Sequence, residues 1–383
     1  MKKLLLFLTL FVTFSLIPGS ANAIEDPLSK ANNKVGIHLL FPAELQEAAK
    51  LVNSNGGDWG YVIIPIQSGD KDIEKWQKFM DEAAKLHVTP IIRLATEGDY
   101  FNTAVWREPT SNDIVDFANF LNSLNWPTKN RYIVVYNETN RGDEWGGNAD
   151  PASYAQLLSY AVTVFKSKST DFFIIGGGFD NAAPQQGSQY NDQYQYIRQM
   201  DNAVPGVFNQ IDGFASHSYP NPGFSQPPTV NTSKSISSFS HERALLQQLS
   251  SKKLPIFITE TGWDGDVVSD PTRAVYYKQA FQQVWRDPDI VTVTPFLLRA
   301  HGGPFTKFSF IKEDGTKTEQ YKAIESLQKI KGSPLVSTKV LGADNEPKTN
   351  LNEVTFKKDR KVNDNNPSLS TAFQTTFAWM MKL

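Results

Sequence analysis

Two short segments place a glutamate directly after a run of β-forming residues. YIVVYNE ends in Asn137-Glu138, and LPIFITE ends in Glu260. A buried strand normally ends in a turn residue such as Gly, Pro or Asp. Two carboxyl groups that face each other can divide acid–base work, because the second charge is costly beside the first and their pKa values separate. Glu138 alone has plainer alternatives, a salt bridge to Arg141 or a cap of the following loop.

The elements that position these glutamates alternate regularly. Apolar runs of strand length recur, and each is followed by an amphipathic helical pattern. The predicted strands are 35–40, 61–66, 88–95, 132–138, 172–178, 211–219, 254–260 and 291–298. The predicted helices are 42–53, 73–86, 111–125, 151–167, 192–202, 239–250, 272–286 and 318–330.

Strict alternation of strands and helices favours parallel strands joined by crossover helices. The strands are continuous apolar runs, as parallel sheets buried on both faces require. Eight such units in about 300 residues predict a (β/α)₈ barrel, the TIM barrel of the α/β class. A doubly wound open sheet is the alternative, but GIHLLFPAE after the first strand is not a G-x-G-x-x-G phosphate loop.

Chemistry in such a barrel occurs at the carboxyl ends of the strands. The polar side chains predicted there are His38, Arg93, Asn137, Glu138, His217, Tyr219 and Glu260. Strands 4 and 7 lie nearly opposite each other, so Glu138 and Glu260 can converge. A protonated carboxyl group facing an ionised one is what cleavage of a glycosidic bond needs.

The segments YNET and FITETGW resemble those of the clan A (β/α)₈-barrel retaining glycoside hydrolases, and ETGW is similar to endo-β-1,3-glucanases. The resemblance implies that Glu138 is the acid/base and Glu260 the nucleophile. It implies that Asn137 bonds the sugar 2-hydroxyl group. Tyr219 and Arg93 would lie beside the nucleophile and hold its charge, although Arg93 has the alternative of neutralising Glu97.

One departure from this family pattern concerns sugar stacking. Many members of the clan have an aromatic residue at the end of strand 8, where this chain has Leu297-Leu298-Arg299. Phe305 and Trp263 are the candidates to replace it. Among the aromatic residues in the loops after the strands, Trp145 and Trp263 are the two we expect to stack on sugar rings.

The two histidines have structural alternatives. His217 is expected to hydrogen-bond within the site or the core, and His38 either lines the pocket floor or is a core histidine. No H-x-H or H-E-x-x-H pattern occurs, so no metal site is predicted. No organic cofactor is expected, and no G-x-S-x-G segment supports Ser/His/Asp hydrolysis.

Composition excludes several kinds of chemistry and of binding partner. The 383 residues carry a net charge of −2 and no cysteine, which excludes disulfides and thiol catalysis. Neither nucleic acid nor an anionic membrane surface is indicated as a partner, because no basic stripe is present.

The two ends of the sequence differ from the barrel. Residues 1–23 have the pattern of a cleaved secretion signal, with Lys2 and Lys3, an apolar run and an A-N-A site ending at Ala23. An uncleaved membrane anchor is the alternative, although the run is short for a span. Residues 24–332 form the predicted catalytic domain, and 333–383 a polar tail.

Together these features predict a secreted or cell-envelope retaining β-glycosidase that degrades a β-linked glycan. The alternative is an inactive carbohydrate-binding or cell-surface protein on the same barrel. Two opposed carboxyl groups favour the enzyme, because binding alone does not need them.

Overall fold

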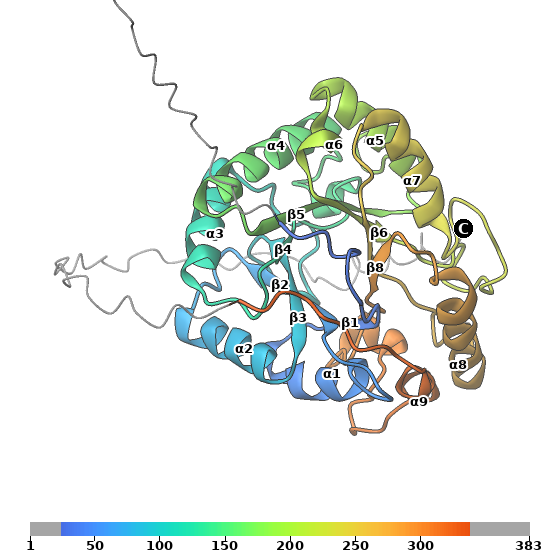
Figure 1. Cartoon of the computed structure of the whole chain (residues 1–383). Helices are drawn as coiled ribbons and strands as arrows, with labels where there is room; N and C mark the ends of the chain where they lie inside the picture. The colour runs from blue at the N-terminus through green and yellow to red at the C-terminus, as the bar shows by residue number, and fades with distance from the viewer. Residues whose placement is uncertain (1–23, 338–383) are drawn as a thin grey trace, which may run out of the picture.

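The computed structural model describes residues 24–337, so the predicted signal at 1–23 and the tail from residue 338 onward lie outside it. Eight parallel strands form one sheet in the order β1 to β8, with helices around it (Figure 1). The strands are β1 Gly36–His38, β2 Gly60–Gln67, β3 Val88–Ala95, β4 Arg131–Val134, β5 Phe172–Asp180, β6 Gly213–His217, β7 Ile256–Glu260 and β8 Ile290–Val293.

The first and last strands meet, which makes the sheet a barrel. A parallel bridge joins Val35 to Val293. The N–H of His38 donates to the carbonyl of Pro295 at 3.0 Å, and the N–H of Leu298 donates to the carbonyl of His38 at 2.9 Å. The predicted (β/α)₈ barrel is therefore confirmed, and the open doubly wound sheet is excluded.

The helices cover the outside of the barrel. They are α1 Leu45–Val52, α2 Ile73–Lys85, α3 Ser111–Ser123, α4 Pro151–Lys168, α5 Gln193–Ala203, α6 Val207–Gln210, α7 Ser238–Leu249, α8 Asp270–Gln279 and α9 Glu319–Ser326. Short 3₁₀ turns lie at Pro42–Glu44 (η1), Gly142–Glu144 (η2) and Gly303–Phe308 (η4), and a π-helical turn, Ala280–Val284 (η3), continues α8. The short α6 was not predicted.

Helix starts follow from local side-chain chemistry. Asp150 accepts hydrogen bonds from the backbone N–H groups of Ala152 and Ser153 at 2.9 and 3.1 Å, and Pro151 occupies the first turn of α4. Such a cap satisfies donors that have no partner within the helix. It also fixes the place where the long loop after β4 must end.

Two apolar layers hold the barrel together. Side chains inside the barrel form one cluster, which includes Tyr61, Ile91, Tyr132, Phe173 and Phe257. A larger cluster fills the space between the strands and the helices. Because both faces of each strand are buried, the sheet is rigid and can place side chains at its carboxyl end.

The amino end of the barrel is closed by two segments distant in sequence. Ile24 and Leu28 pack against the interior cluster. The N–H of Ser333 donates to the carbonyl of Ala31, and the N–H of Ser337 donates to the carbonyl of Pro127. Figure 1 shows both segments crossing this end. The first residues of the predicted tail therefore contact the barrel. Among residues 24–337, no helix is long and apolar enough to cross a membrane.

Candidate active site

The backbone after β4 bends sharply and directs Glu138 over the mouth of the barrel. The predicted strand ran to Glu138, but β4 ends at Val134. Tyr136 and Glu138 have φ angles of 66° and 36°, a left-handed conformation that is costly for residues with side chains and is concentrated at functional sites. The N–H of Glu138 donates to the carbonyl of Gly178 at 2.9 Å, which anchors the bend to β5.

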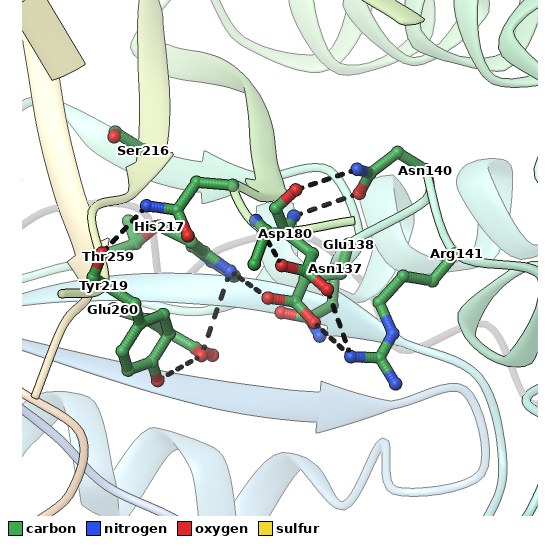
Figure 2. Close-up of polar contacts among 12 residues, drawn as sticks. Asn137, Glu138, Asn140, Arg141, Asp180, Ser216, His217, Tyr219, Thr259 and Glu260 are labelled. Atoms are coloured by element: carbon green, nitrogen blue, oxygen red, sulfur yellow. Dashed lines mark hydrogen bonds and ion pairs between the residues drawn. The ribbon is translucent and has the colours of Figure 1, made fainter. Parts of the chain in front are cut away.

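The two predicted glutamates meet at this mouth. Glu260 is the last residue of β7, and His217, the last residue of β6, lies between the two carboxyl groups (Figure 2). In the part of the chain that the structure describes, one carboxyl oxygen of each glutamate and one ring nitrogen of His217 lie within 4.8 Å of one another. The sequence interpretation thus identified the pair that the fold brings together.

Glu260 is surrounded by groups that favour its ionised form. Arg93 donates to its Oε1 at 2.7 Å, and the hydroxyl of Tyr219 donates to its Oε2 at 3.0 Å. Burial by itself raises the pKa of the Glu260 carboxyl group, but the charges of His217 and Arg93 outweigh burial and lower it. The lowered pKa favours the ionised carboxylate of Glu260, which is the form that can act as a nucleophile.

Glu138 has the opposite environment. Burial and the nearby carboxylate of Asp180 raise its pKa, although His217 and Arg141 oppose the shift. Nδ1 of His217 lies 2.9 Å from Oε1 of Glu138, and Nη1 of Arg141 lies 3.6 Å from Oε2. Arg141 therefore lies near Glu138 as the alternative expected, and the pKa values of the two glutamates are shifted in opposite directions, as acid–base work requires.

His217 links the two carboxyl groups. Its Nδ1 also lies 3.8 Å from Oε2 of Glu260. Burial lowers the pKa of His217, but Glu260 and Glu138 raise it overall. A β-carbon at Gly178 would lie 3.0 Å from Nε2 of His217, so the Gly-rich end of β5 leaves room for this ring. Because Nδ1 of His217 lies 2.9 Å from Oε1 of Glu138, the two groups titrate as a pair rather than separately.

Arg93 and Asn137 form one unit next to Glu260. Nη1 of Arg93 donates both to Glu260 and to the side-chain oxygen of Asn137. The alternative partner Glu97 instead binds Arg107 at 2.7 Å. No described residue accepts a hydrogen bond from Nδ2 of Asn137, which lines the cavity. This amide N–H is available to a ligand.

His38 belongs to the floor beneath the site. Its side chain is fully buried, and Nε2 lies 3.5 Å from Oε1 of Glu260. Its ring packs edge-on against Phe296, with centroids 4.9 Å apart. Burial lowers its pKa to about 3, so the ring is neutral at physiological pH. Of the two alternatives for His38, the burial favours the core histidine: His38 does not line the cavity, so its place among the substrate-binding candidates is corrected, and it lies against Glu260 from below. His217 is likewise 1% exposed and contacts Glu138.

The prediction that Trp145 and Trp263 stack on sugar rings is wrong, because both rings are buried and neither lines the cavity. Their exposed fractions are 1% and 0%. Trp145 packs between Tyr136 and Tyr154. Trp263 packs edge-on against Tyr277, and its Nε1 donates to the carbonyl of Gln226 at 2.8 Å. Trp145 and Trp263 thus pack beneath the loops after β4 and β7 and stabilise them.

Other aromatic residues line the cavity above the glutamates, which encloses about 250 Å³. They are Tyr100, Phe101, Trp106, Phe224, Phe296, Phe305 and Phe308, together with Tyr136 and Tyr219. Phe296 lies in the segment after β8, just before Leu297-Leu298-Arg299, where the sequence interpretation found no aromatic residue. Phe305, which the sequence analysis named as a candidate to replace the missing aromatic residue, does line the cavity.

Several polar residues of the site were not predicted. Asp180 ends β5 and pairs with Arg141 at 3.4 Å, and Arg141 also binds Asp143 at 2.7 Å. The side chain of Asn140 donates to the carbonyl of Asp180 at 3.0 Å (Figure 2). The signal for Asp180 was present in the sequence, because it follows the apolar run of β5 as Glu138 and Glu260 follow theirs.

The same three ligand atoms of Glu138, His217 and Glu260 have the spacing of a metal site. Each carboxylate, however, already has a cation supplied by the chain. Arg93 lies 2.7 Å from Glu260, and Arg141 lies 3.6 Å from Glu138. A divalent cation at this point would be repelled by both guanidinium groups.

Tyr219→Phe tests the environment of Glu260. The variant removes the hydroxyl that donates to Oε2, and a hydrogen bond to a charged group contributes about 1.5–3 kcal/mol. We expect activity to fall about 10- to 100-fold. The acidic limb of the pH–rate profile should move to higher pH, because Glu260 becomes easier to protonate. Tyr160→Phe, an exposed tyrosine on α4, is the control, and an unmoved acidic limb would contradict the assignment.

Trp263→Ala tests the corrected role of the tryptophan. Removing a buried Trp leaves a cavity and typically costs about 3–5 kcal/mol of the free energy of unfolding. We expect the denaturation midpoint in urea to fall. A sugar-stacking role would instead raise KM while leaving the midpoint unchanged, so the two measurements separate packing from binding.

The sequence matches no protein-family model and no curated protein. Solved structures do share its fold. A monomeric β-xylosidase from Caulobacter crescentus CB15 is 15% identical with a TM-score of 0.57, over 77% of this chain and 69% of that chain. A family 39 glycoside hydrolase from Bacteroides cellulosilyticus WH2 is 16% identical with a TM-score of 0.55, over 79% of this chain and 64% of that chain.

A third similar structure is a GH5_18 protein from Streptomyces cattleya in complex with Manβ1-4GlcNAc. It is 12% identical with a TM-score of 0.54, over 78% of this chain and 80% of that chain. At these identities the likeness establishes the fold. The fold is the one predicted, that of (β/α)₈ glycoside hydrolases, and the likeness places the chain in no single family.

Proposed function

We propose that the protein is a glycoside hydrolase that cleaves β-linked glycans with retention of configuration. One observation carries the proposal: Glu138 and Glu260 face each other across the barrel mouth, and their surroundings shift their pKa values in opposite directions. A protonated acid opposite a carboxylate is the arrangement that glycosidic cleavage uses.

The first step forms a covalent glycosyl-enzyme. The Glu260 carboxylate attacks the anomeric carbon while the bond to the leaving oxygen breaks and Glu138 gives that oxygen its proton. Arg93 and Tyr219 hold Glu260 ionised before the attack. Arg141 and His217 orient Glu138 and stabilise the negative charge of its carboxylate after the proton has left.

The second step returns the enzyme to its starting state. Glu138, now a carboxylate, takes a proton from water, and the hydroxide oxygen attacks the anomeric carbon. The bond to Glu260 breaks and its electrons return to the carboxylate. Glu138 is protonated again, and the sugar has its original configuration after two inversions.

The spacing of the carboxyl groups supports retention over inversion. One oxygen from each lies within 4.8 Å of the other. Retaining enzymes have separations of about 5–5.5 Å, whereas inverting enzymes need about 6.5–9.5 Å to accommodate a water molecule. A β-linked substrate is supported by the names of two structural neighbours, a β-xylosidase and a protein bound to Manβ1-4GlcNAc.

Hydrolysis of a panel of aryl β-glycosides and of β-glucan, mannan, xylan and galactan tests the activity. The configuration of the first product, followed by proton NMR before mutarotation, tests the mechanism. We expect the β-anomer to appear first. An α-anomer as first product would overturn retention. Tight binding of one glycan without turnover would indicate a carbohydrate-binding protein instead.

The site of action is proposed to be outside the cytoplasm. The signal pattern at 1–23 supports export, with cleavage after Ala23. Expression of the full chain and amino-terminal sequencing of the exported protein should give Ile24 as its first residue. Retention of the full chain in the membrane would support the uncleaved anchor.

A further inference from the structure

A third carboxyl group lines the cavity and takes no part in the mechanism above. Glu144 is the last residue of the turn η2, in the loop after β4. In residues 24–337, no hydrogen bond or ion pair to its carboxyl group is formed. Its neighbour Asp143 binds Arg141 through both carboxyl oxygens, at 3.0 and 2.7 Å. The guanidinium group of Arg141 is therefore already engaged by Asp143.

The backbone around Glu144 is held by hydrogen bonds, although its side chain has no partner in the described part of the chain. Its N–H donates to the carbonyl of Arg141 at 3.2 Å. The N–H of Trp106 donates to the carbonyl of Asp143 at 2.7 Å, and the N–H of Gly146 donates to the carbonyl of Trp106 at 2.8 Å. These hydrogen bonds join the loop before α3 to the loop before α4. They hold Glu144 at a fixed place in the lining of the cavity.

A second polar group that lines the same cavity also lacks a partner among the described residues. The side chain of Tyr136 is 4% exposed, lines the cavity, and its hydroxyl forms no hydrogen bond with a described residue. A buried hydroxyl without a partner costs about 1–3 kcal/mol. The nearby Arg107 does not relieve it, because Arg107 binds Glu97 and Asp113 at 2.7 and 2.6 Å.

Aromatic surface accompanies these two polar groups. Trp106 and Tyr100 line the same cavity, with ring centroids 6.0 Å apart. Flat aromatic faces beside a few fixed polar groups suit a sugar, whose C–H faces stack while its hydroxyls hydrogen-bond. The arrangement differs from the buried rings of Trp145 and Trp263, because these rings border open space.

The charges of the wall indicate what kind of sugar fits. Each arginine that lines the cavity has an acidic partner: Arg93 binds Glu260, Arg107 binds Asp113, and Arg141 binds Asp143. Glu144 adds an acidic group that forms no ion pair within residues 24–337. A uronic acid or a sulfated sugar would find no unpaired cation among these groups, whereas a neutral sugar requires none.

We propose that Glu144 and Tyr136 form a subsite that binds hydroxyl groups of a neutral sugar ring lying against Trp106. The inference rests on the proposed function, because it concerns how the same cavity selects its glycan. Burial next to Asp143 and Glu138 raises the pKa of Glu144 to about 8, so at lower pH this side chain is an uncharged acid that both donates and accepts.

Binding in the Glu260→Gln background tests the subsite without turnover. The probes are β-1,3- and β-1,4-glucotetraose, β-1,4-mannotetraose and β-1,4-xylotetraose, measured by calorimetry at pH 6. For the tightest probe, we expect Glu144→Ala to raise Kd about tenfold and Tyr136→Phe to raise it about three- to tenfold. Glu144→Gln, an uncharged hydrogen-bonding replacement, should change Kd less than about threefold. Glu74→Ala, an exposed acid on α2, is the control.

The outcomes separate this inference from the proposed function. Hydrolysis by the native enzyme together with Kd values within twofold in Glu144→Ala and Tyr136→Phe would overturn the subsite alone. Affinity losses without hydrolysis would support the subsite and overturn the hydrolase. Absence of binding by every probe would overturn the subsite. If Glu144→Ala also lowers Tm, Tyr136→Phe decides: a loss of affinity at unchanged Tm supports the subsite, and unchanged affinity overturns it.

Discussion

Glu260→Gln is expected to reduce kcat by at least about 10³-fold on every substrate that the native enzyme cleaves. The amide cannot attack the anomeric carbon, so no glycosyl-enzyme forms. The change is nearly isosteric and leaves an acceptor for Arg93 and a partner for Tyr219. Binding of glycan should therefore persist, and a glycan should dissociate from the variant about as readily as from the native protein.

The measurement is the initial rate on the best substrate, together with mass spectrometry after a 2-fluoro glycoside has been added. The native protein should gain the mass of one sugar on the peptide that contains Glu260, and the variant should gain none. Glu97→Gln, an exposed acid that binds Arg107, serves as the matched control. Retention of more than a tenth of native activity by Glu260→Gln would contradict the nucleophile assignment.

Glu138→Ala is expected to have an effect that depends on the leaving group. General acid catalysis contributes about 10²–10⁴-fold, and a sugar leaving group needs it fully. An aryl group with a low pKa leaves without a proton. We therefore expect a loss of at least about 10²-fold on oligosaccharides, and with activated aryl glycosides a slow second step that follows a rapid first one.

Azide separates the two steps in this variant. Because azide needs no general base, it should attack the glycosyl-enzyme on Glu260 directly, raise the rate with aryl glycosides, and give a β-glycosyl azide. The alkaline limb of the native pH–rate profile should also disappear, since this limb reports loss of the proton held by Glu138 and His217. A rate that azide leaves unchanged would count against Glu138 as the acid/base.

The barrel and its glutamate pair could be predicted from the sequence for a clear physical reason. Strands buried on both faces read as continuous apolar runs, so an abrupt change to Asn137-Glu138 marks the strand end within a few residues. The parallel order then places Glu138 and Glu260 at one mouth. Nothing beyond local pattern and topology was needed for this step.

The remaining parts of the site depend on contacts between residues far apart in sequence. Trp145 and Trp263 lie in loops, as Trp106 does, and only tertiary packing decides which ring is buried and which borders the cavity. Arg107 forms an ion pair with Glu97, and Arg93 therefore pairs with Glu260 instead. Glu144 forms no side-chain hydrogen bond or ion pair with another described residue, and such an absence cannot be known before the loops around it are placed.

The segments that cross the amino end of the barrel have a consequence for how the molecule is presented. Ser333 and Ser337 are bonded to Ala31 and Pro127, at the end of the strands opposite to Glu138 and Glu260. Residue 337, the last that the structure describes, therefore lies on the side facing away from the cavity. A molecule tethered through its carboxyl-terminal segment would keep its cavity pointed outward, so that a long glycan could approach without meeting the surface that holds the tether.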